Sequence, residues 1–169
     1  MSSYKIANVK ISLKTSPISL DIVFNNLLEK GYYCKRYQNF LVIKTKFTFI
    51  LFKTNSKGEN HVNITKIPQL SYIKEAIKII KKLTLCTVKS KTIDNIIATT
   101  SANHNLNLKK IVSDQKFSKI KYNNEKFPGL FLKFEKATAI LFHSGKIVIV
   151  GSKSEKNIKW LIKKIFANI

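Results

Sequence analysis

Residues 127–153 have the sequence FPGLFLKFEKATAILFHSGKIVIVGSK, a series of apolar segments separated by short polar turns. Alternation in the strand 146–150 puts two isoleucines on one face and two valines on the other, so both faces are apolar. The short connection HSGK predicts a hairpin and an antiparallel sheet, although two apolar faces are also typical of a parallel sheet. Helices on one side of an antiparallel sheet would leave the other side as an apolar binding surface.

The same kinds of segment recur along the chain. Residues 16–31 have helical spacing between a serine–proline start and a glycine stop, and 37–52 and 61–65 have strand character. Residues 72–83 predict an amphipathic helix with lysines on its polar face. The order then repeats: a strand at 94–100, a helix near 105–115, strands within 118–150 and a C-terminal helix.

The spacing of aromatic residues and asparagines indicates an internal duplication. Tyr37 and Phe52 have counterparts 90 positions later (127 − 37 and 142 − 52), and Asn8 has one 87 positions later (95 − 8). We therefore predict two copies of one unit, residues 1–84 and 85–169. The alternative is a coincidence of spacings in a chain rich in Asn and Phe.

The charge balance narrows the choice of partner. The chain has 31 Lys and Arg against 9 Asp and Glu, a formal net charge of +22, and such a surface attracts polyanions. Nucleic acid is the expected partner. The alternative is that lysine serves only solubility in a chain encoded by an AT-rich genome. A hydrophobic content of 44% is enough for a folded core.

Several classes of protein have no support in the sequence. Cys34 and Cys86 lack the paired spacing of a zinc site or a disulfide framework. No apolar run has the length of a membrane span, and no signal peptide is evident, so we expect a soluble intracellular protein. Without a phosphate-binding loop or a catalytic signature, we expect no enzymatic activity and no cofactor.

An apolar sheet face with a lysine rim suits the minor groove of DNA. The floor of an A·T pair presents only hydrogen-bond acceptors there, so aliphatic contacts and a few amide donors favour A·T. Asn8 and Asn95, one in each repeat, could supply the amides, and Phe127 and Phe142 could open base steps as apolar wedges. The alternatives are core packing for the phenylalanines and turns or caps for the asparagines.

These motifs carry a resemblance to a known family. The segment EKFPGLFLKFEKATAILFHSGKIVIVGSK, with DNIIATTS at 94–101, resembles the second repeat of the TATA-binding protein family. In the first half, ANVKIS, YYCKRY and FTFILF keep the family's order more loosely. The resemblance implies an α+β saddle: two pseudo-symmetric repeats form a curved ten-stranded antiparallel sheet with four helices on its convex face, and the concave face binds and bends DNA.

The resemblance also implies a DNA-binding role for residues of both repeats. Lys10 falls at a position that faces the groove near the dyad. The others are the wedges Tyr37, Phe52, Phe127 and Phe142, with Pro128 beside Phe127; the amide donors Asn8 and Asn95; the groove contacts Ile97, Ile140 and Val148; and the phosphate contact Lys133, to which Lys146 and Lys153 add.

Departures from the family pattern are concentrated in the first repeat. Lys10 replaces a groove-facing valine, Tyr37 a phenylalanine and Ile43 a phosphate-binding arginine, and the first-repeat hairpin lacks the serine–glycine–lysine pattern. In the second repeat, Val150 replaces a groove-facing threonine. These changes predict a relaxed TATA preference and a weaker first repeat. The loop YNNEK keeps only Glu125 of the two acidic residues with which the family holds transcription factor IIB.

The sequence therefore predicts a divergent transcription initiation factor, more typical of a virus than of a well-studied cellular lineage. We expect it to bind and bend A·T-rich DNA as a monomer and to recruit a IIB-like factor and RNA polymerase, with a homodimer as the alternative off DNA. Its expected location is the nucleus if cellular, or the viral factory, virion or host nucleus if viral. The alternative function is a scaffold subunit of a transcription complex without sequence-specific DNA binding. An accessory domain of a nuclease or glycosylase would need a catalytic domain in addition.

Overall fold

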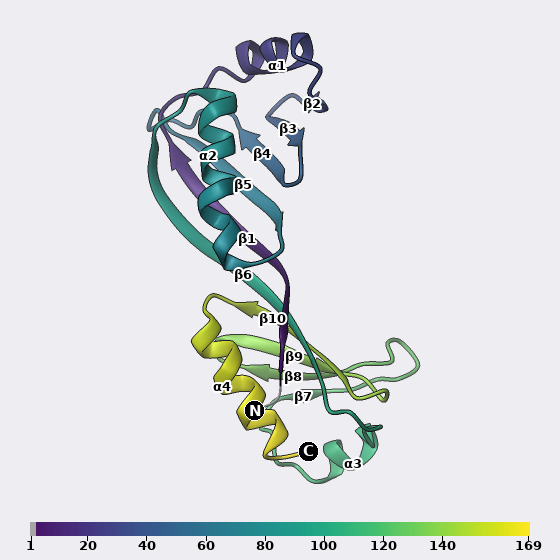
Figure 1. Ribbon diagram of the computed structural model, residues 1–169. Helices are drawn as coiled ribbons and strands as arrows, with labels where there is room; N and C mark the ends of the chain where they lie inside the picture. The colour runs from purple at the N-terminus through teal and green to yellow at the C-terminus, as the bar shows by residue number, and fades with distance from the viewer. Residues whose placement is uncertain (1–2) are drawn as a thin grey trace. The chain divides into compact units, whose positions relative to one another are not determined.

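The computed structural model describes residues 3–169, which form two compact units (Figure 1). The N-terminal unit is Asn8–Asp94, and the C-terminal unit is Asn95–Ile169 together with the first residues through Ala7. Strands β1 (Lys5–Thr15) and β6 (Val88–Ser101) each contribute residues to both units. The predicted repeats 1–84 and 85–169 are units of sequence, and their boundary stays a prediction.

The N-terminal unit contains strands β1 to β5, two helices and the first part of β6. Ser19 caps the first helix by accepting a hydrogen bond from the Ile22 N–H, so this helix begins later than the predicted start at residue 16. After β1, the elements are α1 (Leu20–Glu29), β2 (Cys34–Arg36), β3 (Phe40–Lys44), β4 (Thr48–Phe52), β5 (Asn60–Ile67), the 3₁₀ turn η1 (Leu70–Tyr72) and α2 (Ile73–Thr84).

The C-terminal unit has the same kinds of element in the same order. Asn107 and Ser154 cap its two helices with their side-chain oxygens. After β6, the elements are α3 (Leu108–Ser113), β7 (Ile120–Lys121), β8 (Leu130–Phe134), β9 (Ala137–Leu141), β10 (Lys146–Ser152) and α4 (Glu155–Phe166).

Hydrogen bonds join the ten strands in the order β2-β3-β4-β5-β1-β6-β10-β9-β8-β7. The pairings with a resolved register are antiparallel. The predicted hairpin joins β9 to β10, and Gly145 adopts a φ of +84° in its turn, a conformation that glycine adopts without strain. The predicted α+β class with a ten-stranded antiparallel sheet is thus confirmed, and the parallel alternative is wrong.

In each unit the helices cover one face of the strands. In the C-terminal unit α4 packs against β10, and Ile147 and Ile149 are buried beneath it while Val148 and Val150 stay partly exposed (Figure 1). In the N-terminal unit α2 packs against β5 and buries the matching face there. We call the other face of each unit its open face.

Candidate nucleic-acid interface

A row of paired residues crosses the open face of the C-terminal unit. From β8 to β6 its members, each the register partner of the next, are Phe131, Ile140, Val148 and Thr99. Each of them is partly exposed between two buried neighbours in its strand. Ile97 lies two residues before Thr99 and is partly exposed as well. The structure thus brings the predicted groove contacts Ile97, Ile140 and Val148 onto one open face and adds Phe131, which the sequence analysis missed.

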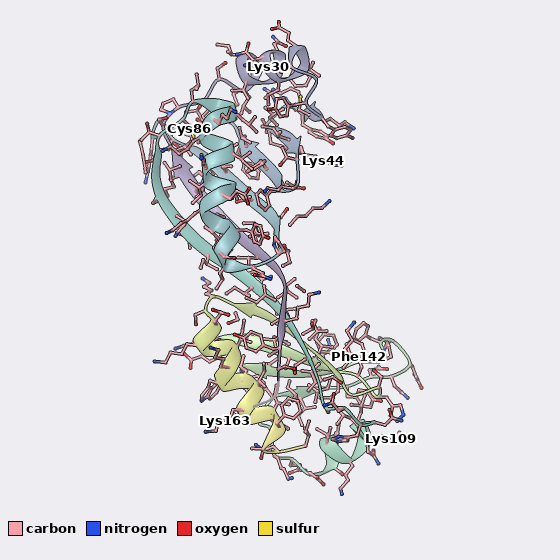
Figure 2. The ribbon with its side chains drawn as sticks, in the orientation of Figure 1. Lys30, Lys44, Cys86, Lys109, Phe142 and Lys163 are labelled. Carbon is pink, nitrogen blue, oxygen red and sulfur yellow. The ribbon has the colours of Figure 1, made fainter. Side chains whose placement is uncertain are left out.

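Three aromatic rings meet at one end of this face. The ring of Phe127 lies 5.2 Å from that of Phe131 and 5.9 Å from that of Phe142, measured between centroids. Phe142 directly follows β9, and Figure 2 shows it away from Lys163 of α4. Phe127 keeps 39% of its surface exposed although it packs against both rings. The two predicted wedges therefore lie together and accessible.

A glycine makes room for the Phe127 ring. A Cβ atom at Gly129 would lie 2.5 Å from Cε1 of Phe127 and 2.8 Å from Cγ2 of Ile140, closer than carbon atoms approach without displacement. Pro128 is exposed beside Phe127 and borders a hollow that Tyr122 and His143 also line. The proline thus faces a second surface as well as the wedge.

The N-terminal unit has a matching row with different chemistry. From β3 to β1 its members, again register partners in sequence, are Val42, Ile50, Asn63 and Ser12. Asn63 occupies the place that Val148 has in the C-terminal unit, and Ser12 the place of Thr99. Half of this row is therefore polar.

The aromatic residues of the N-terminal unit are also arranged differently. Tyr37 stacks on Phe40 with 4.5 Å between ring centroids and an interplanar angle of 20°, and Phe40 lies 6.1 Å from Phe52. Phe40 thus lies between the two predicted wedges, and sequence reasoning missed it. Tyr37 is 39% exposed, and Lys35 places its Nζ 5.1 Å from the tyrosine ring centroid. The Tyr37 ring therefore contacts both Phe40 and Lys35 of its own unit.

The two predicted amide donors differ in their contacts. Asn95 accepts a hydrogen bond at 2.7 Å from the Gly151 N–H through Oδ1, and its NH₂ group, which has no hydrogen-bond partner among residues 3–169, can donate. The Oδ1 atom of Asn8 is buried and has no hydrogen-bond partner within residues 3–169. Gly151 directly follows Val150, which pairs with β9. The equivalent residue of the N-terminal unit directly follows Thr65, which pairs with β4; it is Lys66, with a positive φ of 60°.

A compact group of polar side chains adjoins Ser12. The Ser12 hydroxyl lies 2.9 Å from Oδ1 of Asn63 and hydrogen-bonds with Oδ2 of Asp94, and Nζ of Lys10 lies 3.9 Å from the same carboxylate oxygen. We call Lys10, Ser12, Asn63 and Asp94 the Asp94 cluster. The structure places the predicted Lys10 in this cluster, whereas Asp94 was not predicted. The sequence feature that could have indicated Asp94 is an acidic residue directly before Asn95 in a chain with few acidic residues.

The basic residues at the edge of the open faces differ in one position from the sequence prediction. Lys133 is exposed and pairs with Thr138, and Lys44 is exposed in the same place in β3, where it pairs with Thr48. Ile43, which the sequence analysis matched to a phosphate-binding arginine, is completely buried in the core. That assignment is therefore wrong, and Lys44 holds the basic position. Lys146 and Lys153 are exposed, as is Glu125 in the turn before Phe127.

Within residues 3–169, no group of three or more His, Cys, Asp and Glu side chains is placed to hold a metal ion. None of the helices described is both long and apolar enough to cross a membrane.

Comparisons with known proteins point to one family. The family model of transcription factor TFIID, or TATA-binding protein, matches residues 90–169. The TATA-box-binding protein of Pyrodictium occultum is 39% identical over 79 residues, which are 46% of this chain and 39% of that protein. The protein of the same name from Picrophilus torridus is 34% identical over 112 residues, 62% of this chain and 61% of the relative. The first of these curated relatives is thus matched over about two fifths of its length.

A solved structure extends the similarity over the whole chain. The TATA-binding protein of Methanococcus jannaschii superimposes with a TM-score of 0.81 and 28% identity, covering 98% of this chain and 97% of the other. The stronger sequence similarity lies in the second half, as the motifs predicted. All three relatives are archaeal, so a viral source stays a prediction. The second half of the chain is thus similar in sequence to the TATA-binding protein family, and the whole chain is similar to it in fold.

Proposed function

We propose that this protein is a transcription initiation factor that binds A·T-rich promoter DNA in the minor groove and bends it. The family relationship supports this activity, and the open face of the C-terminal unit supplies the chemistry. The observation that carries the proposal is the row Phe131, Ile140, Val148 and Thr99, which presents a largely apolar surface on an antiparallel sheet.

The physical argument concerns the groove floor and the base steps. An aliphatic surface fits A·T pairs, whereas the N2 amino group of guanine projects from the floor of the groove. The free NH₂ group of Asn95 can donate to the acceptors that A·T pairs present there. Rings at a strand end can enter a base step and unstack it, and the bend then brings more protein surface into contact. Phe127 and Phe142 have the exposure and the position for this role.

The proposed partners follow from the same relationship. We expect a IIB-like factor and RNA polymerase to join the DNA complex, with Glu125 as a contact in the exposed turn before Phe127. The protein would bind DNA as a monomer. It would act where the DNA template lies, in a nucleus or a viral factory. Replacement of Glu125 by Gln should then weaken assembly of the factor on a preformed DNA complex without changing DNA binding itself.

Energy transfer between dyes at the two ends of a short duplex tests the proposal. An A·T-rich site and a G·C-substituted site are compared across a salt series, because phosphate contacts alone weaken steeply as salt rises. We expect a bend that prefers the A·T-rich site and persists at moderate salt.

Variants identify the groups responsible for the bend. Phe127→Ala with Phe142→Ala should abolish it, whereas Trp160→Ala, which removes an exposed aromatic residue of α4, should leave it intact. Binding without a bend that is indifferent to sequence and to the phenylalanines would favour the scaffold alternative instead.

A further inference from the structure

We propose that the Asp94 cluster makes the N-terminal unit select a base pair with a minor-groove amino group, as in G·C, while the C-terminal unit selects A·T. The inference rests on the proposed function, since it concerns DNA bound along the open faces. It assigns a specificity-determining role to Asp94, acting with Lys10, Ser12 and Asn63.

The first observation is the position of the cluster. Asn63 and Ser12 are the last two members of the row across the N-terminal open face, where the C-terminal unit has Val148 and Thr99. Both side chains are partly exposed, and their neighbours along the strands are buried. Lys10 lies two residues before Ser12, in the place that Ile97 has before Thr99. The polar groups are therefore in the part of the face that corresponds to aliphatic groove contacts.

The second observation is the count of hydrogen-bonding groups. A serine hydroxyl has a single proton, and two oxygens, Asn63 Oδ1 and Asp94 Oδ2, lie within hydrogen-bonding reach of it. An ionised carboxylate can accept about four hydrogen bonds, and within residues 3–169 Asp94 accepts one, from this hydroxyl. Lys10 Nζ, at 3.9 Å, is an ion-pair partner beyond hydrogen-bonding distance. Asp94 thus keeps unused acceptor capacity, and its side chain is still 28% exposed.

The unused acceptor capacity of the Asp94 carboxylate has a specific consequence in the minor groove. An A·T pair presents only A N3 and T O2, which are also acceptors, so a carboxylate placed against them has no donor to bind. Guanine adds an N2 amino group, which donates to a carboxylate or to an amide oxygen. Against an A·T pair the Asp94 carboxylate would lose water without gaining a hydrogen bond, which costs free energy. This penalty favours G·C over A·T at that position.

The C-terminal unit offers no such acceptor on its row. The side chains there are aliphatic or aromatic apart from Thr99, and the nearby Asn95 has its oxygen occupied by Gly151 and its NH₂ group free. The two units therefore have opposite preferences at equivalent positions. A preferred site would be A·T-rich in one half and would contain a G·C pair in the other.

The test measures bending and affinity on duplexes that differ in one minor-groove amino group. Starting from an A·T-rich site, one pair at a time is replaced by G·C, and the best of these duplexes is repeated with inosine·C. Inosine lacks the N2 amino group and otherwise keeps the minor-groove pattern of guanine. We expect one half of the site to prefer G·C over inosine·C by about tenfold, the effect of one hydrogen bond to a charged group.

Two variants show whether the carboxylate is responsible. Asp94→Asn keeps the shape and adds a donor, so the preference for G·C over inosine·C should disappear and A·T should be favoured there. Glu59→Gln removes the same charge from another lysine ion pair of the N-terminal unit, with Lys89 at 3.3 Å, and serves as the matched control. It should raise affinity for all duplexes alike and keep the G·C preference.

The outcomes separate the two proposals. A bend with equal preference for A·T along the whole site, or an Asp94→Asn variant that behaves like Glu59→Gln on every duplex, overturns this inference and leaves the proposed function intact. Failure to bend any duplex overturns the proposed function and this inference together. Unfolding curves for both variants identify a loss of folding, in which case Asp94→Ser replaces Asp94→Asn and must show the same loss of discrimination.

Discussion

Phe40 and Gly129 occupy equivalent positions in the two units. Phe40 directly precedes Leu41, which pairs with β4, and Gly129 directly precedes Leu130, which pairs with β9. In the C-terminal unit the glycine lets the Phe127 ring lie close to the backbone. In the N-terminal unit the Phe40 ring fills this place, and Tyr37 stacks on it instead. One unit therefore supports its wedge on the main chain and the other on a second ring.

Replacement of Gly129 by Ala should destabilise the C-terminal unit. The added methyl group meets the Phe127 ring and Ile140, and overpacking of this kind costs about 1–3 kcal/mol of unfolding free energy. Denaturant unfolding followed by the fluorescence of Trp160, the only tryptophan, measures the loss. In a Phe127→Ala background the cost should fall, because the ring is absent. Equal costs in both backgrounds would contradict the proposed contact.

Lys44 and Lys133 should contribute equally to the salt dependence of DNA binding. Both are exposed at equivalent strand positions on the open faces, so each variant to Ala should lower the salt slope by about one. Affinity measured at several salt concentrations gives the slope. Lys74→Ala, on α2, is the control and should leave it nearly unchanged. If the salt dependence of DNA affinity were the same for Lys44→Ala as for the parent protein, the N-terminal unit would lack this phosphate contact.

Lys66→Gly should stabilise the N-terminal unit. Lys66 has a φ of 60°, a conformation that costs a residue with a Cβ about 1 kcal/mol and that glycine adopts freely. We expect the unfolding free energy to rise by about 1 kcal/mol, measured by denaturant unfolding with circular dichroism. Lys53→Gly, at a position without positive φ, should lower it. A loss of stability in both variants would refute the strain at Lys66.

Stability should fall in alkaline solution through Tyr4. Burial, the hydrogen bond to Glu155 at 2.9 Å and the negative charge of Glu155 raise the pKa of Tyr4 from its usual 10.0 to about 12. The folded state holds the neutral phenol, so this contribution is complete below about pH 10 and is lost as pH rises towards 12. The unfolding free energy measured over this range should decline less in Tyr4→Phe than in the parent. Parallel declines would show that lysine deprotonation alone causes the change.

Local periodicity was sufficient to predict most of the fold. Alternation in β10 predicted that its isoleucines and its valines lie on opposite faces, and the helical spacing of 72–83 predicted α2 to within one residue at each end. These patterns depend only on the repeat of the strand or the helix. The start of α1 was placed too early because Ser16 and Ser19 both precede the apolar run, and the cap is at Ser19.

The pairing register was harder to predict. The spacing of 90 holds for Phe52 and Phe142, but Leu41 and Leu130, which pair equivalently, are 89 apart (130 − 41). One additional residue thus lies between Tyr37 and Leu41 in the first unit. A shift of one residue moves a side chain to the other face of a sheet, which is why Ile43 was assigned to the rim although it is buried.

The Asp94 cluster depends on contacts between distant parts of the chain. Ser12 is 51 positions from Asn63 and 82 from Asp94, so no local pattern connects them. Lys10 could be predicted because it departs from the family pattern, whereas the contacts of Asp94 could not, because its partners Ser12 and Lys10 are distant in the sequence. Side-chain partners across strands become visible only once the pairing is known.

The composition of the C-terminal unit has a consequence for the order of folding. This unit includes residues from both ends of the sequence: Thr100 donates a hydrogen bond to the Ser3 carbonyl at 2.7 Å, and Tyr4 contacts Glu155, 151 positions away. During synthesis all of Asn8–Asp94 is made before most of the residues that Ser3 and Tyr4 contact. The N-terminal unit can therefore fold while the chain is still growing, whereas the C-terminal unit must close a long loop and becomes complete only after α4 is made. The part of the molecule that carries Phe127 and Phe142 is thus the last to form.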